Sequence, residues 1–382
     1  MGKLASVLDY REAARRRLPR FLFEYFDGGS YTETTLARNV ADLQAVELRQ
    51  RVMRDVSGIK LSTELFGQTF ALPVGLGPIG LAGLAARRGE VQAARAAEAA
   101  GVPFSLSTVG ACSLAEVRRG TERPFWFQLY MIRDRGFMED LLAQAREAGC
   151  SALLFTVDMP VPGARYRDVR SGLAGAAGFS GGLRRLGQAL VRPDWVWDVG
   201  ICGRPHSLGN VAPVLGRKSG LEDFMGWMAS NFDPSVTWRD LDFVRERWSG
   251  PLLIKGVLDP EDAVAAAELG ADGIVVSNHG GRQLDGAPST ARALPKVAQA
   301  VGERLTVLAD GGVRSGLDVL RLLALGAKGV LLGRAWAYGL AGGGQAGVAH
   351  VLRLVEAELR AAMALTGCTR IGDIDGSRLA LN

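Results

Sequence analysis

The chain contains few of the residues from which disulfide frameworks and metal centres are built. Its 382 residues include 4 Cys and 3 His. The cysteines form no Cys-x-x-Cys pair and stand apart at Cys112, Cys150, Cys202 and Cys368. We therefore expect no disulfide framework and a reducing compartment. Because the three histidines are separated and no His-Glu-x-x-His motif occurs, we also expect no metal site.

Targeting, membrane-spanning and nucleic-acid-binding patterns are missing as well. The first twenty residues carry charges throughout and lack the apolar core of a signal peptide. The longest uncharged stretch near the start, 70–86, contains four Gly and two Pro, which is typical of a strand and a loop. There is no zinc-finger spacing and no continuous basic block, so nucleic acid is not an expected partner. We expect a soluble or peripherally attached protein.

The charge balance favours anionic partners. The net charge is +5 and the pI is about 9.2. Such a balance suits phosphate, carboxylate or an anionic membrane surface.

Eight short apolar or β-branched runs recur from residue 72 onward, most of them separated by stretches rich in Ala, Leu, Glu and Arg. They lie at 72–76, 103–107, 125–129, 153–157, 252–256, 273–277, 305–309 and 329–333. Alternating strands and helices imply parallel pairing with right-handed crossovers. Eight such units favour a closed (β/α)8 barrel of the TIM type, with an open doubly wound sheet as the structural rival.

We expect one domain over 1–382, made of an N-terminal helical cap (1–65) and the barrel (66–382). Helical patterns run through 4–60 and are interrupted at Asp27-Gly28-Gly29. An insertion at about 171–222 follows the fourth strand, and long segments of this kind are usually functional or disordered. Within it, 171–220 carries six Lys and Arg against two Asp, a net charge of +4.

Polar side chains follow nearly every strand of the predicted barrel, and the carboxyl ends of the strands form the active face of such folds. These positions are Pro78-Ile79-Gly80, Ser107, Gln128 with Tyr130, Thr156 with Asp158, Lys255, Ser277-Asn278-His279, Asp310-Gly311-Gly312 and Gly333-Arg334. Solvated loops would not place single polar groups so regularly. We therefore predict the active site at this end of the barrel.

The last two strand ends suit a phosphate group. Glycines and a cation follow strands seven and eight in the segments 309–316 and 331–335. Barrels bind phosphate there through backbone N–H groups and a helix N-terminus, and Arg314 and Arg334 would add positive charge. Flavin mononucleotide and a sugar phosphate both satisfy such a site.

His279 is the only histidine expected at a strand end, because His206 lies in the insertion and His350 in a late helix. Arg282 follows three residues later and offers a planar fork for a carboxylate. A base beside such a clamp fits proton abstraction from a small acid. Asp158 is a plausible acidic partner for the imidazole, by the logic of catalytic triads.

Residue type alone does not decide the roles of two further basic residues. Arg165 either completes the carboxylate clamp or is a solvated loop residue. Lys255 ends an apolar run and needs a partner if it is buried. It is either a Schiff-base amine, as in aldolases, or a fixed cation beside a cofactor that becomes anionic on reduction.

The segment SNHGGRQLDG (277–286) resembles the signature of the FMN-dependent 2-hydroxy-acid oxidising enzymes. The resemblance covers nearly the whole chain. Within this family it is strongest to the bacterial quinone-linked L-lactate dehydrogenases. The segments that carry it are FDGGSYTETTLARN, WFQLYMIRDRGFM, FTVDMPVPGARYRD, NFDPSVTW and KGVLDPEDA.

The resemblance implies oxidation of an L-2-hydroxy acid, with L-lactate to pyruvate as the best match. It implies six residues at the substrate: His279, Asp158, Arg282, Arg165, Tyr130 and Tyr25. His279 takes a proton during the oxidation and Asp158 pairs with it. The two arginines bind the carboxylate, and the two tyrosines reach the substrate.

The resemblance also implies FMN as the cofactor. The side chains expected at the flavin ring or its chain are Ser107, Gln128, Thr156, Lys255 and Ser277. The backbone of Pro78, Ile79 and Gly80 would line the ring. The phosphate would be held by Asp310, Gly311, Gly312, Arg314, Gly333 and Arg334. Lys255 would then act as a cation near the reduced flavin.

The partners implied by the resemblance are a quinone or another electron acceptor, an anionic membrane surface and other copies of the chain in a homotetramer. The protein would be free or peripherally attached on the cytoplasmic side of the inner membrane. We expect 171–220 to make the membrane contact, with a lid or a subunit interface as its other possible roles. Val109 and Ile79-Gly80 depart from the glycolate oxidases, which have an aromatic residue and Thr-Ala there.

Several alternatives stay open from the sequence. The acid can be mandelate or another 2-hydroxy acid, and the acceptor can be oxygen. A Schiff-base aldolase and a non-catalytic phosphate-binding barrel are the alternatives from other classes. The order of electron and proton transfer, by hydride or through a carbanion, is also open.

Overall fold

A computed structural model of the chain describes residues 4–174, 179–204, 208–215, 226–227 and 230–380. His206 and parts of the predicted insertion, at 175–178, 205–207 and 216–222, lie outside the described residues.

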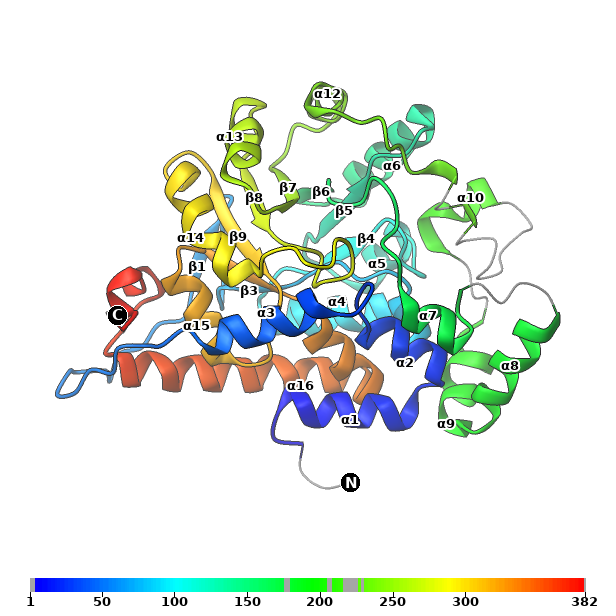
Figure 1. Cartoon of the computed structure of the whole chain (residues 1–382), viewed down its shortest axis with the longest axis horizontal. Coiled ribbons are helices and arrows are strands. Elements are labelled where there is room, and N and C mark those ends of the chain that lie inside the picture. Colours follow the sequence, from blue (N-terminus) through cyan, green and yellow to red (C-terminus); the bar gives the residue numbers. More distant parts are fainter. Residues whose placement is uncertain (1–3, 175–178, 205–207, 216–225, 228–229, 381–382) are drawn as a thin grey trace.

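The centre of the molecule is a parallel eight-stranded sheet closed into a barrel (Figure 1). Its strands are β3 (Val74–Leu76), β4 (Ser105–Ser107), β5 (Trp126–Tyr130), β6 (Ala152–Thr156), β7 (Leu252–Val257), β8 (Gly273–Val276), β9 (Thr306–Asp310) and β10 (Gly329–Leu332). The order is β3-β10-β9-β8-β7-β6-β5-β4. A parallel bridge between Leu76 and Phe104 joins β3 to the segment before β4 and closes the ring. The (β/α)8 barrel predicted from the apolar runs is confirmed.

The inside of the barrel has an apolar layer below and a polar layer above it. A separate cluster of buried side chains fills the lower layer: Trp126, Leu154, Leu253, Val275, Leu308 and Leu331. Two residues further along the same strands stand Gln128, Thr156, Lys255, Ser277, Asp310 and Gly333. Because side chains on a strand alternate between the two faces, residues two apart point to the same side. The apolar side chains of the lower layer and the polar side chains of the upper layer therefore both point into the barrel.

A short antiparallel hairpin that we did not predict closes the amino-terminal end of the barrel. It consists of β1 (Thr63–Leu65) and β2 (Gln68–Phe70). Phe66 and Phe70 meet Trp126 edge to face, with ring centroids 6.0 and 6.1 Å apart. The hairpin thereby shields the lower layer from solvent, and it spans the boundary expected between residues 65 and 66.

Helices between the strands cover the outside of the barrel. They are α4 (Gly89–Ala99), α5 (Leu114–Gly120), α6 (Arg135–Glu147), α13 (Pro260–Glu268), α14 (Thr290–Val301), α15 (Gly316–Ala324) and α16 (Arg334–Thr366). α16 combines two helices across a kink at Gly343 and Gly344, whose backbone angles are not helical. Among the described residues, no helix combines the length and apolarity needed to cross a membrane.

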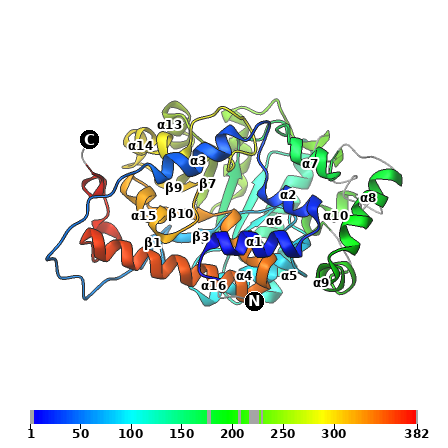
Figure 2. The same cartoon turned by 60° about the horizontal axis from the view of Figure 1, so that its bottom comes forward.

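The N-terminal segment forms the expected helices, α1 (Val7–Arg17), α2 (Arg20–Asp27) and α3 (Thr34–Gln44). The helical reading was wrong for 45–60, which forms turns and isolated bridges, among them Lys60 to Arg370. In both views α1 lies along α16 (Figures 1 and 2), and α3 packs against α14 and α15.

The described part of the long connection between β6 and β7 is largely helical. It contains α7 (Tyr166–Ser171), α8 (Phe179–Leu190), α9 (Pro193–Trp195), η2 (Val196–Ile201), η3 (Gly209–Val211), α10 (Ala212–Leu215), η4 (Trp238–Leu241) and α12 (Asp242–Arg247). α8 and α9 lie at the edge of the molecule (Figure 1), next to α2.

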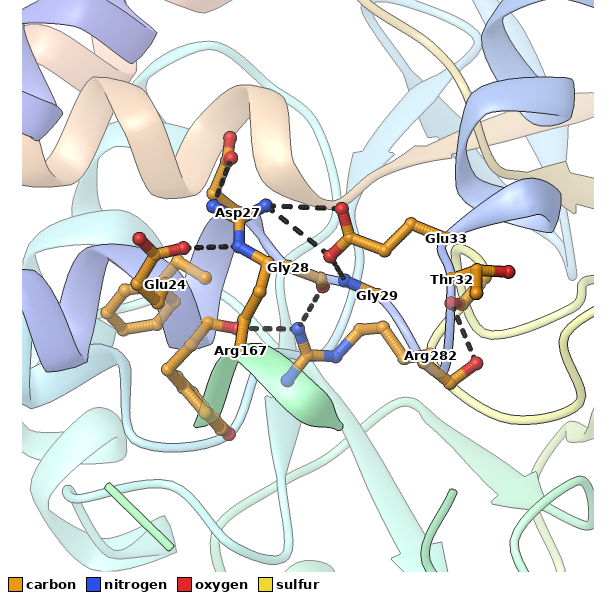
Figure 3. A network of polar contacts seen from close by, with 12 residues as sticks. Glu24, Asp27, Gly28, Gly29, Thr32, Glu33, Arg167 and Arg282 are labelled. Carbon is orange, nitrogen blue, oxygen red and sulfur yellow. Dashed lines mark hydrogen bonds and ion pairs between the residues drawn. The ribbon is translucent and has the colours of Figure 1, made fainter. Parts of the chain in front are cut away.

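Asp27, the last residue of α2, joins the N-terminal helices to the rest of the fold. Its buried carboxylate accepts bonds from Arg11 Nε (2.6 Å), Arg167 Nη2 (2.8 Å) and Tyr338 Oη (2.6 Å). These donors belong to α1, α7 and α16. Arg167 is also bonded to Glu24 and lies 3.4 Å from Glu33 (Figure 3). Burial alone raises the pKa of Asp27, but its three donors lower it well below the usual range.

Replacing Asp27 by Asn should destabilise the protein by roughly 2–3 kcal/mol at pH 7. The loss stays below that of a fully buried pair because both arginines are partly exposed. Since the folded pKa is depressed, this stabilisation is complete above the unfolded pKa of about 4 and declines as the pH falls toward the folded value. Thermal unfolding at pH 7 and pH 3 measures it. The exposed Asp140→Asn serves as control, and an equal loss at both pH values would contradict the assignment.

Candidate active site

A cavity opens at the carboxyl ends of the barrel strands, where the sequence predicts the site. Sixteen of the residues that we singled out line it: Tyr25, Tyr130, Arg165, His279, Arg282, Pro78, Ile79, Gly80, Thr156, Lys255, Asp310, Gly311, Gly312, Arg314, Gly333 and Arg334. The other four do not line it. Asp158 stands behind His279, and Ser107, Gln128 and Ser277 are buried beside lining residues.

His279 and Asp158 meet although 121 residues separate them in sequence. The Nδ1 atom of the imidazole lies 2.9 Å from Oδ1 of Asp158. Burial lowers the pKa of His279 despite the nearby carboxylate, and His279 in turn lowers the pKa of Asp158 although burial opposes this. A neutral imidazole that donates Nδ1–H to an anionic carboxylate keeps its Nε2 lone pair for a proton.

The backbone around this histidine is held in an uncommon conformation. His279 has a φ of +57°, and Gly280 and Gly281 continue in the left-handed region. Left-handed backbone is costly for a residue with a side chain and persists only when its surroundings enforce it. Here His279 N–H donates to Ser277 Oγ, and Asn278 exchanges amide bonds of 2.8 Å with Asn39 of α3.

A buried cation lies below the histidine, paired on two sides. Lys255 Nζ lies 3.1 Å from Ser277 Oγ and 3.3 Å from Asp310 Oδ2. Ser277 Oγ in turn donates to Asp310 Oδ1 at 2.7 Å. Burial opposes the charge, but Asp310 and Asp158 outweigh it and raise the pKa of Lys255 above its ordinary value. A protonated lysine is a poor Schiff-base nucleophile, so this arrangement supports the fixed-cation reading.

Two arginines face the same cavity. Arg282 Nη1 donates to the carbonyls of Tyr25 (2.5 Å) and Gly28 (2.8 Å), and its guanidinium lies over the Tyr25 ring at 4.9 Å. Figure 3 shows this side chain reaching toward Gly28. Arg165 is half-buried, its buried Nε has no partner, and desolvation together with Arg282 lowers its pKa. Two neighbouring cations with unused donors suit a bound carboxylate.

Both tyrosines belong to this part of the cavity. Tyr130 is almost fully buried, and burial and the charge of Asp158 raise its pKa, so it remains a phenol that can donate. Tyr25 Oη lies 3.4 Å from the carbonyl of Gly80. Gly80 leaves space that a Cβ would fill, because that atom would lie 2.8 Å from Val109 and 3.1 Å from Tyr25 Oη.

Buried polar atoms without a partner indicate where a flavin would bind. Gln128 Nε2 and Thr156 Oγ1 are buried and have no hydrogen-bond partner. Ser107 Oγ donates to Gln128 Oε1 at 2.9 Å, which orients the amide and leaves its nitrogen unused. Unsatisfied buried donors are costly, so a ligand with polar edges is expected at them. The ring edge of FMN fits this requirement.

The loops after β9 and β10 form the end of the cavity where the sequence predicts a phosphate. Gly311 and Gly312 have φ values of +104° and +81°, and a Cβ on Gly312 would lie 2.2 Å from Asn39 O. Only glycine fits there. Arg334 donates to the carbonyls of Phe26, Asp27, Gly28 and Gly280. This leaves one N–H on each Nη for an anion, so Arg334 has both a structural role and free donors.

Sequence reasoning missed the carbonyl end of α2 and its contribution to the site. The carbonyls of residues 25–28 hold Arg282 and Arg334 in place. Backbone acceptors have no sequence signature. The Asp27-Gly28-Gly29 stop was visible, but it indicates only where the helix ends. Within the described ranges no group of three or more His, Cys, Asp or Glu could hold a metal ion.

Comparison with known proteins shows the family. The model of the FMN-dependent dehydrogenase family matches residues 14–381. An L-lactate dehydrogenase of Caulobacter sp. (strain K31) is 67% identical over 377 residues, which cover 99% of this chain and 98% of that protein. The L-lactate dehydrogenase of Caulobacter vibrioides (strain NA1000 / CB15N) is 64% identical with the same coverage.

Solved structures are similar over the whole chain. A monotopic membrane protein, (S)-mandelate dehydrogenase, has a TM-score of 0.93 and 36% identity, with both chains fully covered. Mandelate oxidase has a TM-score of 0.83 and 38% identity over 99% of this chain and 98% of that one. These findings show that the chain belongs to the FMN-dependent dehydrogenase family and uses FMN as its cofactor.

Proposed function

We propose that this protein oxidises L-lactate to pyruvate and passes the electrons to a quinone. The observation that carries the proposal is the His279–Asp158 pair facing two arginines in one cavity. A base and a carboxylate clamp are what oxidation of a small 2-hydroxy acid requires. Relatives at 60–67% identity are called L-lactate dehydrogenases, whereas the mandelate enzymes are 36–38% identical, which favours lactate over mandelate.

The catalytic proposal assigns each side chain a task at the substrate. Arg165 and Arg282 bind the carboxylate, and Tyr25 and Tyr130 donate to the substrate oxygens. His279 Nε2 takes up a proton from the hydroxy acid. Asp158 fixes the Nδ1–H tautomer and stabilises the imidazolium that forms. When bound, FMN accepts the two electrons.

The cofactor proposal divides the upper end of the barrel into two parts. Ser107, Gln128, Thr156 and Ser277 would contact the flavin, against the backbone of 78–80. The phosphate would lie on the loops 310–314 and 333–334. Lys255 supplies positive charge next to the ring, which favours a flavin that carries more negative charge after reduction.

The outer face of α8 supports peripheral membrane contact. Its polar side chains bond the rest of the protein. Arg184, itself exposed, and Arg185 donate to the carbonyls of Arg170 and Gly172, and Gln188 bonds Phe21 N–H and Ser171 O. Its leucines point outward, with Leu183, Leu186 and Leu190 between 52% and 65% exposed. This is the reverse of a water-facing helix, which buries its apolar side.

The neighbouring segment extends this apolar face. Trp197 and Ile201 of η2 are 65% and 53% exposed, whereas Trp195 is buried and donates to Leu84 O. Tryptophan favours the headgroup boundary of a bilayer. We propose that α8 and η2 meet the cytoplasmic surface of the inner membrane, where a quinone is accessible, and that the protein assembles as a homotetramer.

His279→Gln should retain FMN and fold but lose roughly 10²–10⁴-fold in kcat, because the general base is gone. Steady-state turnover with L-lactate and a dye acceptor measures the loss, and the flavin absorbance checks the cofactor. His350→Gln is the matched control, because His350 bonds Tyr10 outside the cavity. Near-normal turnover by the His279 variant would contradict the assignment of His279 as the general base.

Arg282→Lys should raise KM for L-lactate and lower kcat. Lysine lacks the planar fork and cannot both hold the α2 carbonyls and bind a carboxylate. Kinetics of the variant beside the exposed control Arg304→Lys measure both parameters. If the wild-type enzyme oxidised lactamide as well as L-lactate, the carboxylate clamp would be refuted.

The double variant Leu186→Gln/Leu190→Gln should bind vesicles at least tenfold more weakly, since each buried leucine contributes roughly 1.5–3 kcal/mol. Co-sedimentation with anionic vesicles gives the affinity, and turnover with a soluble acceptor confirms that the variant folds. The control Val52→Gln/Leu365→Gln changes two exposed apolar residues elsewhere. Equal sedimentation of all three proteins would show that α8 is not the contact face.

A further inference from the structure

A groove rich in arginine lies outside the active site, where α4, α5, η2 and the kink of α16 meet. We call it the arginine groove. The basic residues that line it are Arg17, Arg87, Arg88, Arg95 and Arg119. Its acidic residues are Glu116 and Asp198. The charge balance of the lining is therefore strongly positive, and none of these residues lines the flavin cavity.

The two carboxylates satisfy only part of this charge. Asp198 is bonded to Arg17 and lies 3.9 Å from Arg87 Nε, while Glu116 lies 3.2 Å from Arg88 Nη1. Arg95 donates Nε–H to the carbonyl of Gly120 and keeps its other donors. Arg119 is exposed, and its side chain makes no ion pair or hydrogen bond to any described residue. Unused guanidinium donors that converge on one groove suit a phosphate group.

The backbone adds to the positive potential. α4 is an 11-residue helix that begins at Gly89, next to Arg87 and Arg88. The N-terminal end of a helix carries partial positive charge on its free N–H groups. The arginines and the helix end therefore act in the same direction.

The arginine groove adjoins the apolar face of α8 and η2. Asp198 contributes to the groove from η2, and its neighbour Trp197 is exposed on the same helix. Tryptophan side chains lie at the level of the headgroups when a protein sits on a bilayer. A groove one residue away from such an anchor would then lie at the depth of the lipid phosphates.

We propose that the arginine groove binds the phosphate of anionic phospholipid headgroups when the apolar face meets a bilayer. The inference rests on the membrane contact proposed above and adds a lipid preference to it. The apolar face supplies insertion, which does not depend on headgroup charge. The groove supplies selectivity for anionic lipid, which weakens as salt screens the charges.

The test compares vesicles of phosphatidylcholine alone with vesicles that also contain phosphatidylglycerol. Arg87→Gln/Arg119→Gln removes two exposed arginines, leaving the bonds of Arg17 and Arg88 in place. We expect roughly 10- to 30-fold weaker binding to the anionic vesicles at low salt, little change with phosphatidylcholine, and a smaller difference at high salt. Arg239→Gln/Arg304→Gln removes the same charge from two exposed arginines outside the groove and should bind like the wild type.

The outcomes separate the groove from the apolar face. Equal binding by the wild type and the groove variant, or an equal loss in the control, would overturn the proposed role of the arginine groove. The proposed membrane contact of the apolar face would still stand. Equal binding of the wild type to both vesicle types would have the same consequences. If the wild type bound neither, both proposals would fail. Inorganic phosphate bound by the wild type but not by the groove variant, with equal vesicle binding, would assign the groove to a soluble anion instead.

Discussion

The carboxyl end of α2 is the contact on which the arrangement of the active site depends. Its carbonyls receive Arg282 and Arg334, and its last side chain, Asp27, receives three donors from α1, α7 and α16. The C-terminus of a helix carries partial negative charge, so it is a favourable place for guanidinium groups. One short helix thus aligns the outer helices and two arginines that line the cavity. The N-terminal segment is therefore part of the site as well as its cover.

The charged side chains inside the barrel are paired with each other within the upper layer. Lys255 and Asp310 would each be costly alone in the interior, but they neutralise each other and share Ser277. The same serine receives the N–H of His279 and so connects the charged pair to the strained loop. Some buried polar atoms beside the cavity nevertheless remain without partners. Gln128 Nε2 and Thr156 Oγ1 are of this kind.

The surface around α8 is unusual because the apolar side of this helix is exposed. Elsewhere the amphipathic helices turn their apolar side to the core, whereas α8 bonds the protein through its polar side. In water this orientation contributes little hydrophobic stabilisation, because the leucines of α8 remain exposed. Its position beside α2 and α7 places this face within the same cluster of helices that covers the substrate cavity. Membrane contact and catalysis would then be neighbours in the fold.

Local patterns in the sequence predicted the barrel and most of the singled-out residues that line its cavity. The period of the apolar runs identified all eight strands, because a strand leaves a local, repeated pattern. The polar residues after most of the runs identified the end where the cavity opens. His279, Lys255 and the glycines at 311–312 were recognisable for the same reason. Which of these residues meet depended on the three-dimensional fold. It brought Asp158 to His279 across 121 positions, paired Lys255 with Asp310 and placed the hairpin under Trp126. It also turned the leucines of α8 outward and used the backbone carbonyls of α2 as ligands. These features depend on long-range contacts and on main-chain atoms that every residue shares, so no local pattern of side chains records them.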